Sequence, residues 1–105
     1  MIRRSKYGNV KVKADGYTFD SKAEYRRYQE LKLLEKAKEI FYLEVHPKWK
    51  ININGTKICE YEADFCYQDA NDDPHVEDTK GVRTAVYRLK KKLMKACFGI
   101  DIIET

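Results

Sequence analysis

The sequence predicts a mixed α/β fold, and three observations support that prediction. Residues 61–65 and 75–81 both have strand composition, and residues 68–74 between them are rich in turn formers. Residues 21–40 and 84–98 have apolar side chains at helical spacing. A short apolar segment after the second helix, residues 100–103, is expected to return to the sheet as a strand. The predicted core order is therefore helix, three strands, helix, strand.

The chain begins with a basic arm and a short hairpin. Two apolar segments, residues 10–12 and 17–19, flank Ala14, Asp15 and Gly16. Asp-Gly is a favoured sequence for a two-residue hairpin turn. We therefore expect residues 1–19 to form an arm or hairpin in front of a core that spans residues 20–105.

The first helix is expected to start at Ser21 and to run to about Ile40. Glu24 falls in line with Tyr28 and Leu31, so the first turn of the buried stripe carries a carboxylate aimed at the sheet. Ser21 and Glu24 also have the spacing of a capping box, in which the glutamate binds backbone instead of doing chemistry. The sequence leaves both interpretations of Glu24 open.

The middle of the chain is expected to form strands that lead to Asp64. Residues 43–53 alternate in their second half, and Pro47 suggests a strand edge or a bulge. Asn54-Gly55 then turns the chain into the strand of Asp64. In the last helix, we expect a stripe of apolar side chains to face the core before Gly99 ends the helix. That stripe consists of Val86, Leu89, Leu93 and Cys97.

The hairpin around residues 68–74 brings two acidic side chains together. A turn centred near Asn71 pairs Asp64 with Asp78, at a Cβ separation of roughly 5 Å. Strand alternation places Lys80 on the same face as Asp78 and turns Glu77 away, so Glu77 is expected to be structural or to support a ligand from behind. Glu77 is also the alternative candidate for a metal ligand.

Two carboxylates at this separation repel each other unless a positive charge lies between them. A hard cation such as Mg²⁺, with Mn²⁺ as a substitute, binds carboxylate oxygens together with water and phosphate. The ammonium of Lys80 would help to activate a water or offset charge on a phosphate. The alternative is an ordinary surface hairpin with ion pairs.

Together these residues resemble the PD-(D/E)XK nuclease superfamily. The resemblance covers most of the chain and is greatest to small phage and prophage proteins related to Holliday-junction resolvases. The matching blocks are residues 6–9, 19–24, 63–65 and 77–81. Ala63 stands where the superfamily name expects proline.

The resemblance implies a restriction-endonuclease-like α-β-β-β-α-β core and a metal-dependent endodeoxyribonuclease that acts on branched DNA. It assigns Asp64 and Asp78 as metal ligands, Lys80 as the catalytic lysine and Glu24 as a further metal ligand or water-positioning carboxylate. A nicking or end-processing nuclease, or a non-catalytic nucleic-acid-binding module on the same fold, is the alternative. Because a resolvase cuts two strands, a homodimer is expected.

Charge is consistent with a nucleic-acid partner. The chain has 21 basic and 17 acidic residues, a net charge of +4, and its bases gather in the N-terminal arm and the last helix. The residues expected to contact DNA are Arg3, Arg4, Lys6, Lys22, Arg83, Thr84, Tyr87, Lys90 and Lys91.

The remaining features predict one intracellular domain. A length of 105 residues fits a single domain, and no apolar run reaches the length of a membrane span. Three cysteines without C-x-x-C spacing are expected to be reduced packing residues. We expect a cytoplasmic protein, located in the bacterial host if a phage encodes it.

Overall fold

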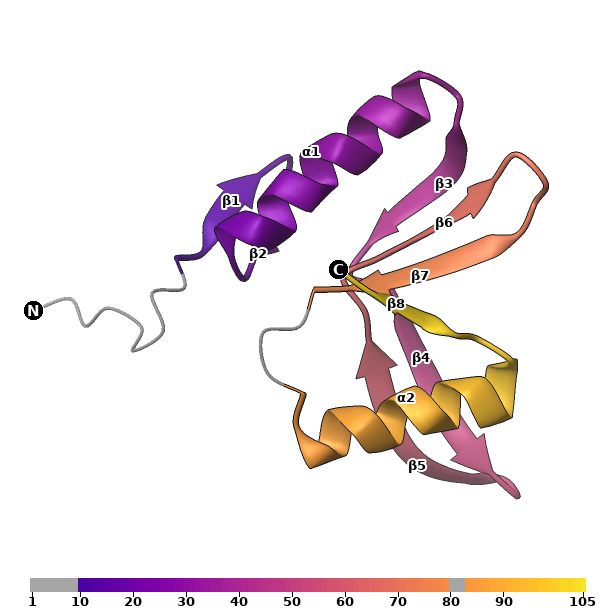
Figure 1. Cartoon of the computed structure of the whole chain (residues 1–105). Coiled ribbons are helices and arrows are strands. Elements are labelled where there is room, and N and C mark those ends of the chain that lie inside the picture. Colours follow the sequence, from indigo (N-terminus) through magenta and orange to yellow (C-terminus); the bar gives the residue numbers. More distant parts are fainter. Residues whose placement is uncertain (1–9, 80–82) are drawn as a thin grey trace, which may run out of the picture.

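A computed structural model of the chain describes residues 10–79 and 83–105 (Figure 1). These residues form a mixed α/β fold with two helices and eight strands. The elements are β1 (Val12–Ala14), β2 (Tyr17–Phe19), α1 (Lys22–Lys36), β3 (Ile40–Val45), β4 (Lys48–Ile53), β5 (Thr56–Glu62), β6 (Phe65–Asp69), β7 (Pro74–Asp78), α2 (Ala85–Phe98) and β8 (Ile102–Glu104). The fold class predicted from sequence is confirmed at this level.

The main sheet has four strands in the order β3-β6-β7-β8. β6 is antiparallel to both of its neighbours, β3 and β7, whereas β8 pairs with β7 in parallel. Parallel neighbours need a long crossover, and α2 lies in that connection. The expected return of the chain to the sheet after the basic helix is therefore confirmed.

β3 and β4 together pair with β5 and β6 as one long hairpin that is bent in the middle. Hydrogen bonds continue through the bend, because the His46 amide donates to the Asp64 carbonyl at 2.9 Å and the Ala63 amide donates to the Pro47 carbonyl at 3.0 Å. The backbone of His46 is left-handed there, with φ of 55°. Histidine is among the residues more often found in that region. The predicted irregularity at Pro47 is thus a bend that carries β4 and β5 away from the sheet (Figure 1).

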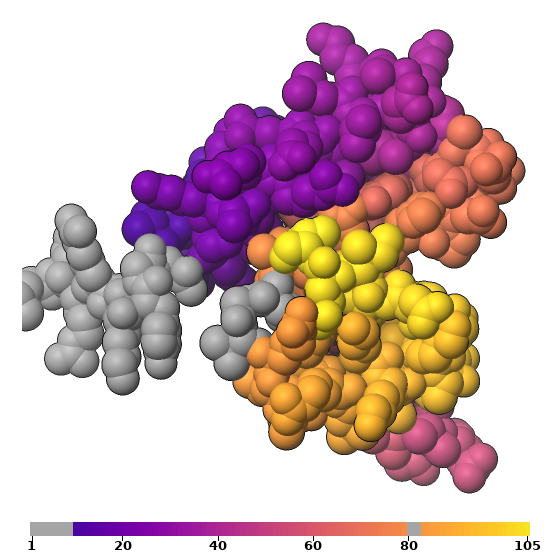
Figure 2. Space-filling view, in the orientation of Figure 1, coloured from indigo at the N-terminus to yellow at the C-terminus, as the bar shows by residue number. Residues whose placement is uncertain are grey.

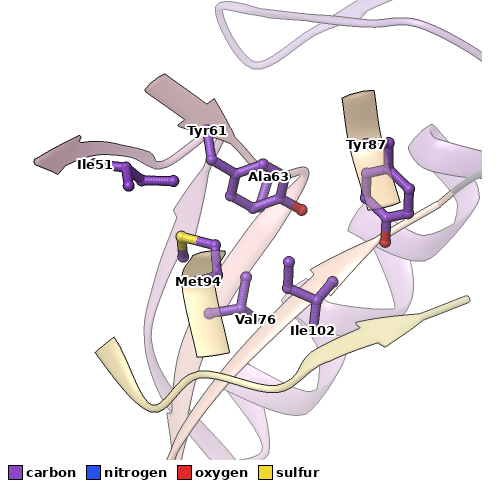
Figure 3. Close-up of a cluster of buried hydrophobic side chains, with 7 residues drawn as sticks. All are labelled: Ile51, Tyr61, Ala63, Val76, Tyr87, Met94 and Ile102. Carbon is purple, nitrogen blue, oxygen red and sulfur yellow. The ribbon is translucent and has the colours of Figure 1, made fainter. Parts of the chain in front are cut away.

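Two hydrophobic clusters lie on opposite faces of the sheet. The first packs α1 and β2 against β3 and β6, and its buried members are Phe19, Tyr28, Leu31, Ile40 and Phe65. The second packs α2 and the β4–β5 hairpin against β7 and β8, as Figure 3 shows; its buried members are Ile51, Tyr61, Ala63, Val76, Tyr87, Met94 and Ile102. We call these the α1 cluster and the α2 cluster.

The N-terminal hairpin matches its prediction. β1 and β2 pair from Val12 with Phe19 to Ala14 with Tyr17. The turn residues Asp15 and Gly16 both have positive φ, 53° and 82°, as the tight hairpin turn requires. Phe19 is fully buried, so the hairpin is anchored in the α1 cluster.

The first helix ends earlier than predicted. α1 stops at Lys36, and Ile40 is already the first residue of β3. Lys38 adopts a left-handed conformation with φ of 62°, and the Glu39 amide donates to the Leu34 carbonyl at 2.9 Å. This is a C-terminal helix motif in which glycine is usual. Because lysine occupies that position here, the sequence carries no visible stop signal.

The predicted core face of the second helix is wrong. Val86 and Leu89 are 61% and 56% exposed, and Cys97 is also exposed. Tyr87 and Met94 are buried instead, about two helical turns apart, and Leu93 only packs at the edge. The helix therefore docks through the face that carries Tyr87 and Met94, which pack with residues of the β4–β5 hairpin and β8, and the Val86–Leu89 side is left exposed. Thr84 and Gly99 do cap the helix as expected.

The last strand is shifted. β8 comprises Ile102–Glu104, two residues later than the segment predicted from residue 100. Ile100 instead packs at the edge of the α2 cluster. Within the described ranges, neither helix is long and apolar enough to cross a membrane.

Candidate functional site

Three acidic side chains come from three different elements and approach one another at the bend. Glu24 lies in the first turn of α1, Asp64 lies in the bend between β5 and β6, and Asp78 is the last residue of β7. β6 and β7 pair in the predicted register from Gln68 with Pro74 to Phe65 with Glu77. Asp64 immediately precedes this ladder, and its amide donates to the Glu77 carbonyl at 3.1 Å, which places it next to the end of β7. The Thr79 amide donates to Asp64 Oδ2 at 2.6 Å and fixes this corner of the hairpin.

Glu24 is buried, with 3% of its surface exposed, and both of its oxygens have partners. Ser21 Oγ accepts from the Glu24 amide at 3.1 Å, while Glu24 Oε2 accepts from the Asp20 amide at 3.0 Å. These contacts resemble a capping box shifted by one residue. The other oxygen, Oε1, lies 2.7 Å from His46 Nε2. Glu24 therefore caps α1 and also reaches the bend, so the two interpretations from sequence are not exclusive.

Asp78 is held from the other side of the sheet. It is 1% exposed, and the hydroxyl of Tyr61 donates to its Oδ2. Burial and the bond to Asp78 raise the pKa of Tyr61 well above its usual value, so the phenol stays protonated and acts as donor. Tyr61 belongs to the α2 cluster, which ties the position of Asp78 to that core.

The three carboxylates interact electrostatically. The pKa of Asp64 is raised from 3.8 to about 7. Burial is the largest cause, and the negative charges of Asp78 and Glu24 act in the same direction, while the hydrogen bond from the Thr79 amide opposes them. Asp64 is therefore partly protonated near neutral pH in the absence of a cation. A divalent cation would remove the repulsion that keeps this proton in place.

A pH-dependent stability follows for the metal-free protein. Because the folded pKa of Asp64 lies above the unfolded value, the folded state holds a proton that the unfolded state has released between roughly pH 4 and pH 7. The free energy of unfolding should consequently fall as pH rises through this window and level off above pH 7. Urea unfolding in chelator at pH 5 and pH 8 measures the difference.

Asp64→Asn is the matched variant, because asparagine still accepts from the Thr79 amide but does not titrate. The decline in stability between pH 5 and pH 8 should be smaller in this variant than in the wild type. An equal decline in both proteins would show that Asp64 does not carry the raised pKa.

Glu77 faces the opposite side of β7 from Asp78, toward α1, as strand alternation predicts. Its oxygens accept from Arg27 Nε and Nη2, both at 2.7 Å, and from the hydroxyl of Tyr67. Glu77 is 1% exposed, so this bidentate pair connects α1 to the sheet beneath it. Glu77 is structural in this arrangement.

Two hollows adjoin the site. One, of about 370 Å³, is lined by Lys11, Thr18, Asp20, His46, Glu62, Ala63 and Asp64. The other, of about 430 Å³, is lined by Lys48, Glu60, Tyr61, Glu62, Thr84, Val86, Tyr87 and Lys90. Glu62 lines both, so the hollows lie next to each other along the bend, with lysines in each.

The residues predicted to contact DNA lie in different places and have different partners. Lys22 is exposed at the start of α1, and Lys90 lines the second hollow. Thr84 Oγ1 accepts from the Tyr87 amide at 3.1 Å and so caps α2. The carboxylate of Glu104 contacts Arg83, Lys91 and the hydroxyl of Tyr87. Tyr87 is nearly buried, so it serves to hold α2 on β8.

Four of the predicted site residues lie outside the described residues. They are Arg3, Arg4, Lys6 and Lys80. Among residues 10–79 and 83–105, no three histidine, cysteine, aspartate or glutamate side chains are grouped closely enough to hold a metal ion as they stand. Coordination by these acids would therefore require side-chain rotation.

Sequence reasoning missed two residues of the site, His46 and Tyr61. Both lie on the bent hairpin and reach acidic side chains that are distant in the chain. In the sequence, nothing distinguishes Tyr61 from an ordinary strand residue. The signal available for His46 was its position before Pro47, where the alternating pattern breaks.

Comparison with known families gives one result. The model of the family described as protein of unknown function (DUF1064) matches residues 4–101. The chain belongs to the DUF1064 family. Comparison with curated proteins and with solved structures gave no match. The DUF1064 match spans all three acidic residues and the bend between them.

Proposed function

We propose that this protein is a metal-dependent endonuclease that hydrolyses DNA phosphodiesters. The observation that supports this most directly is the electrostatic contact of Asp64 with Asp78 and Glu24 in a partly buried setting. Perturbed carboxylates beside a hollow are typical of functional sites. An ordinary surface hairpin would leave these acids exposed and paired with bases.

The element order supports a restriction-endonuclease-like core. When the bent hairpin is counted as two strands, the described chain runs α1, three antiparallel strands, α2 and a final strand parallel to the third. This is the α-β-β-β-α-β order that the resemblance implies. The locations of the acids also support the proposal, with Glu24 at the start of α1, Asp64 in the bend before β6 and Asp78 at the end of β7.

The donor chemistry suits Mg²⁺ or Mn²⁺. Asp64 and Asp78 would hold the ion, and Glu24 lies behind them. When bound, such an ion supplies an activated water and offsets charge on the scissile phosphate. In the metal-free protein, Tyr61 holds one oxygen of Asp78 and the Thr79 amide holds one oxygen of Asp64. Lys80, which follows two residues after Asp78, is proposed as the catalytic lysine.

The surroundings suit a phosphate backbone. Lys11 lines the hollow beside Asp64, while Lys48 and Lys90 line the adjacent one, so basic side chains flank the acids on two sides. Lys11 forms a long ion pair with Asp20, at 4.0 Å. Within the described chain, Lys48 and Lys90 form no ion pair with an acid. We propose branched DNA as the substrate and a homodimer as the unit that cuts both strands.

The test is incubation of the purified protein with labelled four-way junction, flap, duplex and single-stranded DNA. We expect junction cleavage with Mg²⁺ or Mn²⁺ and none with chelator. Paired symmetric cuts identify a resolvase, and single cuts identify a nicking or end-processing enzyme. Binding without any cut on any substrate would overturn the nuclease proposal in favour of a binding module.

A further inference from the structure

The strained corner of the bent hairpin carries an imidazole next to Asp64. His46 has left-handed backbone with φ of 55°, and its amide donates to the Asp64 carbonyl. Strained conformations of non-glycine residues persist where the surrounding structure fixes them, and they cluster at functional sites. The positions of His46 and Asp64 are therefore coupled through the backbone itself.

One ring nitrogen of His46 forms a hydrogen bond with Glu24. An ionised carboxylate only accepts hydrogen bonds, so Nε2 carries the proton in the 2.7 Å contact with Glu24 Oε1. Glu24 Oε2 is in turn anchored by the Asp20 amide. The ring also packs on Phe19, with 6.0 Å between ring centroids. The imidazole is thus fixed in orientation from two directions.

The other ring nitrogen, Nδ1, makes no hydrogen bond within the described part of the chain. In the neutral ring this nitrogen is an acceptor and so a metal donor. His46 and Asp64 line the same hollow of about 370 Å³, whereas Glu24 and Asp78 do not line it. Of the two side chains in the Glu24–His46 contact, the imidazole is therefore the one that borders the hollow beside Asp64.

A histidine that binds a metal through one nitrogen almost always donates its other N–H to a carboxylate or carbonyl. The Glu24–His46 contact has this form. We propose that His46 Nδ1 is a ligand of the divalent cation bound by Asp64 and Asp78, and that Glu24 orients the imidazole instead of binding the ion. This inference rests on the proposed function, because it assumes the same cation site.

The assignment has a consequence for the choice of metal. Imidazole nitrogen suits Mn²⁺ and later transition metals better than Mg²⁺, which prefers oxygen ligands. A site built from two carboxylates and one imidazole therefore binds Mn²⁺ more tightly than Mg²⁺. The side-chain rotation needed for coordination involves Asp64 and Asp78, since His46 is already held.

Pulsed electron paramagnetic resonance of the Mn²⁺-loaded protein tests the proposal directly. A directly bound imidazole gives a nitrogen coupling, which changes character when the protein is labelled with ¹⁵N-histidine. The chain has two histidines, and both pair with a carboxylate, since His75 Nε2 lies 2.8 Å from Asp69 Oδ2. His75→Asn is therefore a matched control for His46→Asn.

Asparagine is the chosen replacement because it tolerates left-handed backbone and so preserves the bend. We expect nitrogen coupling in the wild type and in His75→Asn, and its loss in His46→Asn with Mn²⁺ affinity lowered about ten- to a hundredfold. Glu24→Gln keeps an acceptor for Nε2–H, so the coupling should persist in that variant. Circular dichroism confirms that each variant is folded.

Two results would overturn the proposal in distinguishable ways. If Mn²⁺ binds and DNA is cut but no nitrogen coupling appears, or if the coupling persists in His46→Asn, then His46 is not a ligand while the nuclease proposal stands. If the wild type binds no Mn²⁺ and cuts no DNA, the nuclease proposal fails and this inference with it.

Discussion

Replacing Asp78 by asparagine is expected to lower the rate of DNA cleavage about a thousandfold. A bound cation contributes several kcal/mol of transition-state stabilisation, and each 1.4 kcal/mol or so corresponds to a tenfold change in rate. Asp78 is fully buried at the end of β7, where the Tyr61 hydroxyl holds one of its oxygens. Single-turnover cleavage of the preferred DNA at saturating Mg²⁺ measures the loss.

Asparagine is preferable to alanine because its amide oxygen still accepts from the Tyr61 hydroxyl. The variant should therefore fold and bind DNA with affinity close to that of the wild type. Asp69→Asn is the control, since that aspartate lies at the far end of the β6–β7 hairpin and pairs with His75. Cleavage retained by Asp78→Asn, or lost equally in Asp69→Asn, would contradict the assignment of Asp78.

Replacing Arg27 by alanine is expected to cost about 3 kcal/mol in the free energy of unfolding. The substitution leaves the carboxylate of Glu77 buried without its cation, and removing one partner of a buried pair typically costs about 3–5 kcal/mol. Arg27 is itself 27% exposed, which argues for the lower end of that range. The midpoint of thermal unfolding should fall by roughly 15 °C.

Arg26→Ala is the matched control, because Arg26 is an exposed arginine on the same helix. Its effect should stay within about 0.5 kcal/mol. The double variant Arg27→Met with Glu77→Met should be more stable than Arg27→Ala, since it removes the buried charge as well as its partner. If Arg27→Ala unfolds at the wild-type temperature, the pair does not connect α1 to the sheet.

The part of the fold that sequence predicts best is governed by local chemistry. Asp15-Gly16 and the residues around Asn71 require specific turns, and those turns determine which residues pair. Once the register around Asn71 is known, Asp64 must lie opposite Asp78 and Glu77 must face the other side. The paired aspartates were predictable for this reason.

The docking of α2 was not predictable from apolar spacing alone. Val86 and Leu89 form a regular aliphatic stripe, yet the helix buries Tyr87 and Met94. The choice depends on the β4–β5 hairpin, which the bend at His46 places over α2 (Figure 1). That geometry is a tertiary property, and no local pattern encodes it.

The contact between His46 and Glu24 was hidden for a similar reason. It joins residues 22 positions apart, and it exists only because a left-handed residue redirects the hairpin. Sequence correctly suggested a carboxylate aimed at the sheet, but the side chain that meets it could be identified only once the bend was known.

The bent hairpin also determines when the acidic residues can act together. Glu24 is positioned by the α1 cluster and Asp78 by Tyr61 of the α2 cluster, while Asp64 lies at the corner between the two. Figure 2 shows the layer of α1 in violet and the layer of α2 in orange to yellow. Local opening of either layer would disperse the acids even if the other stayed folded. Neither half of the chain, expressed alone, should therefore keep the three acidic side chains in this arrangement.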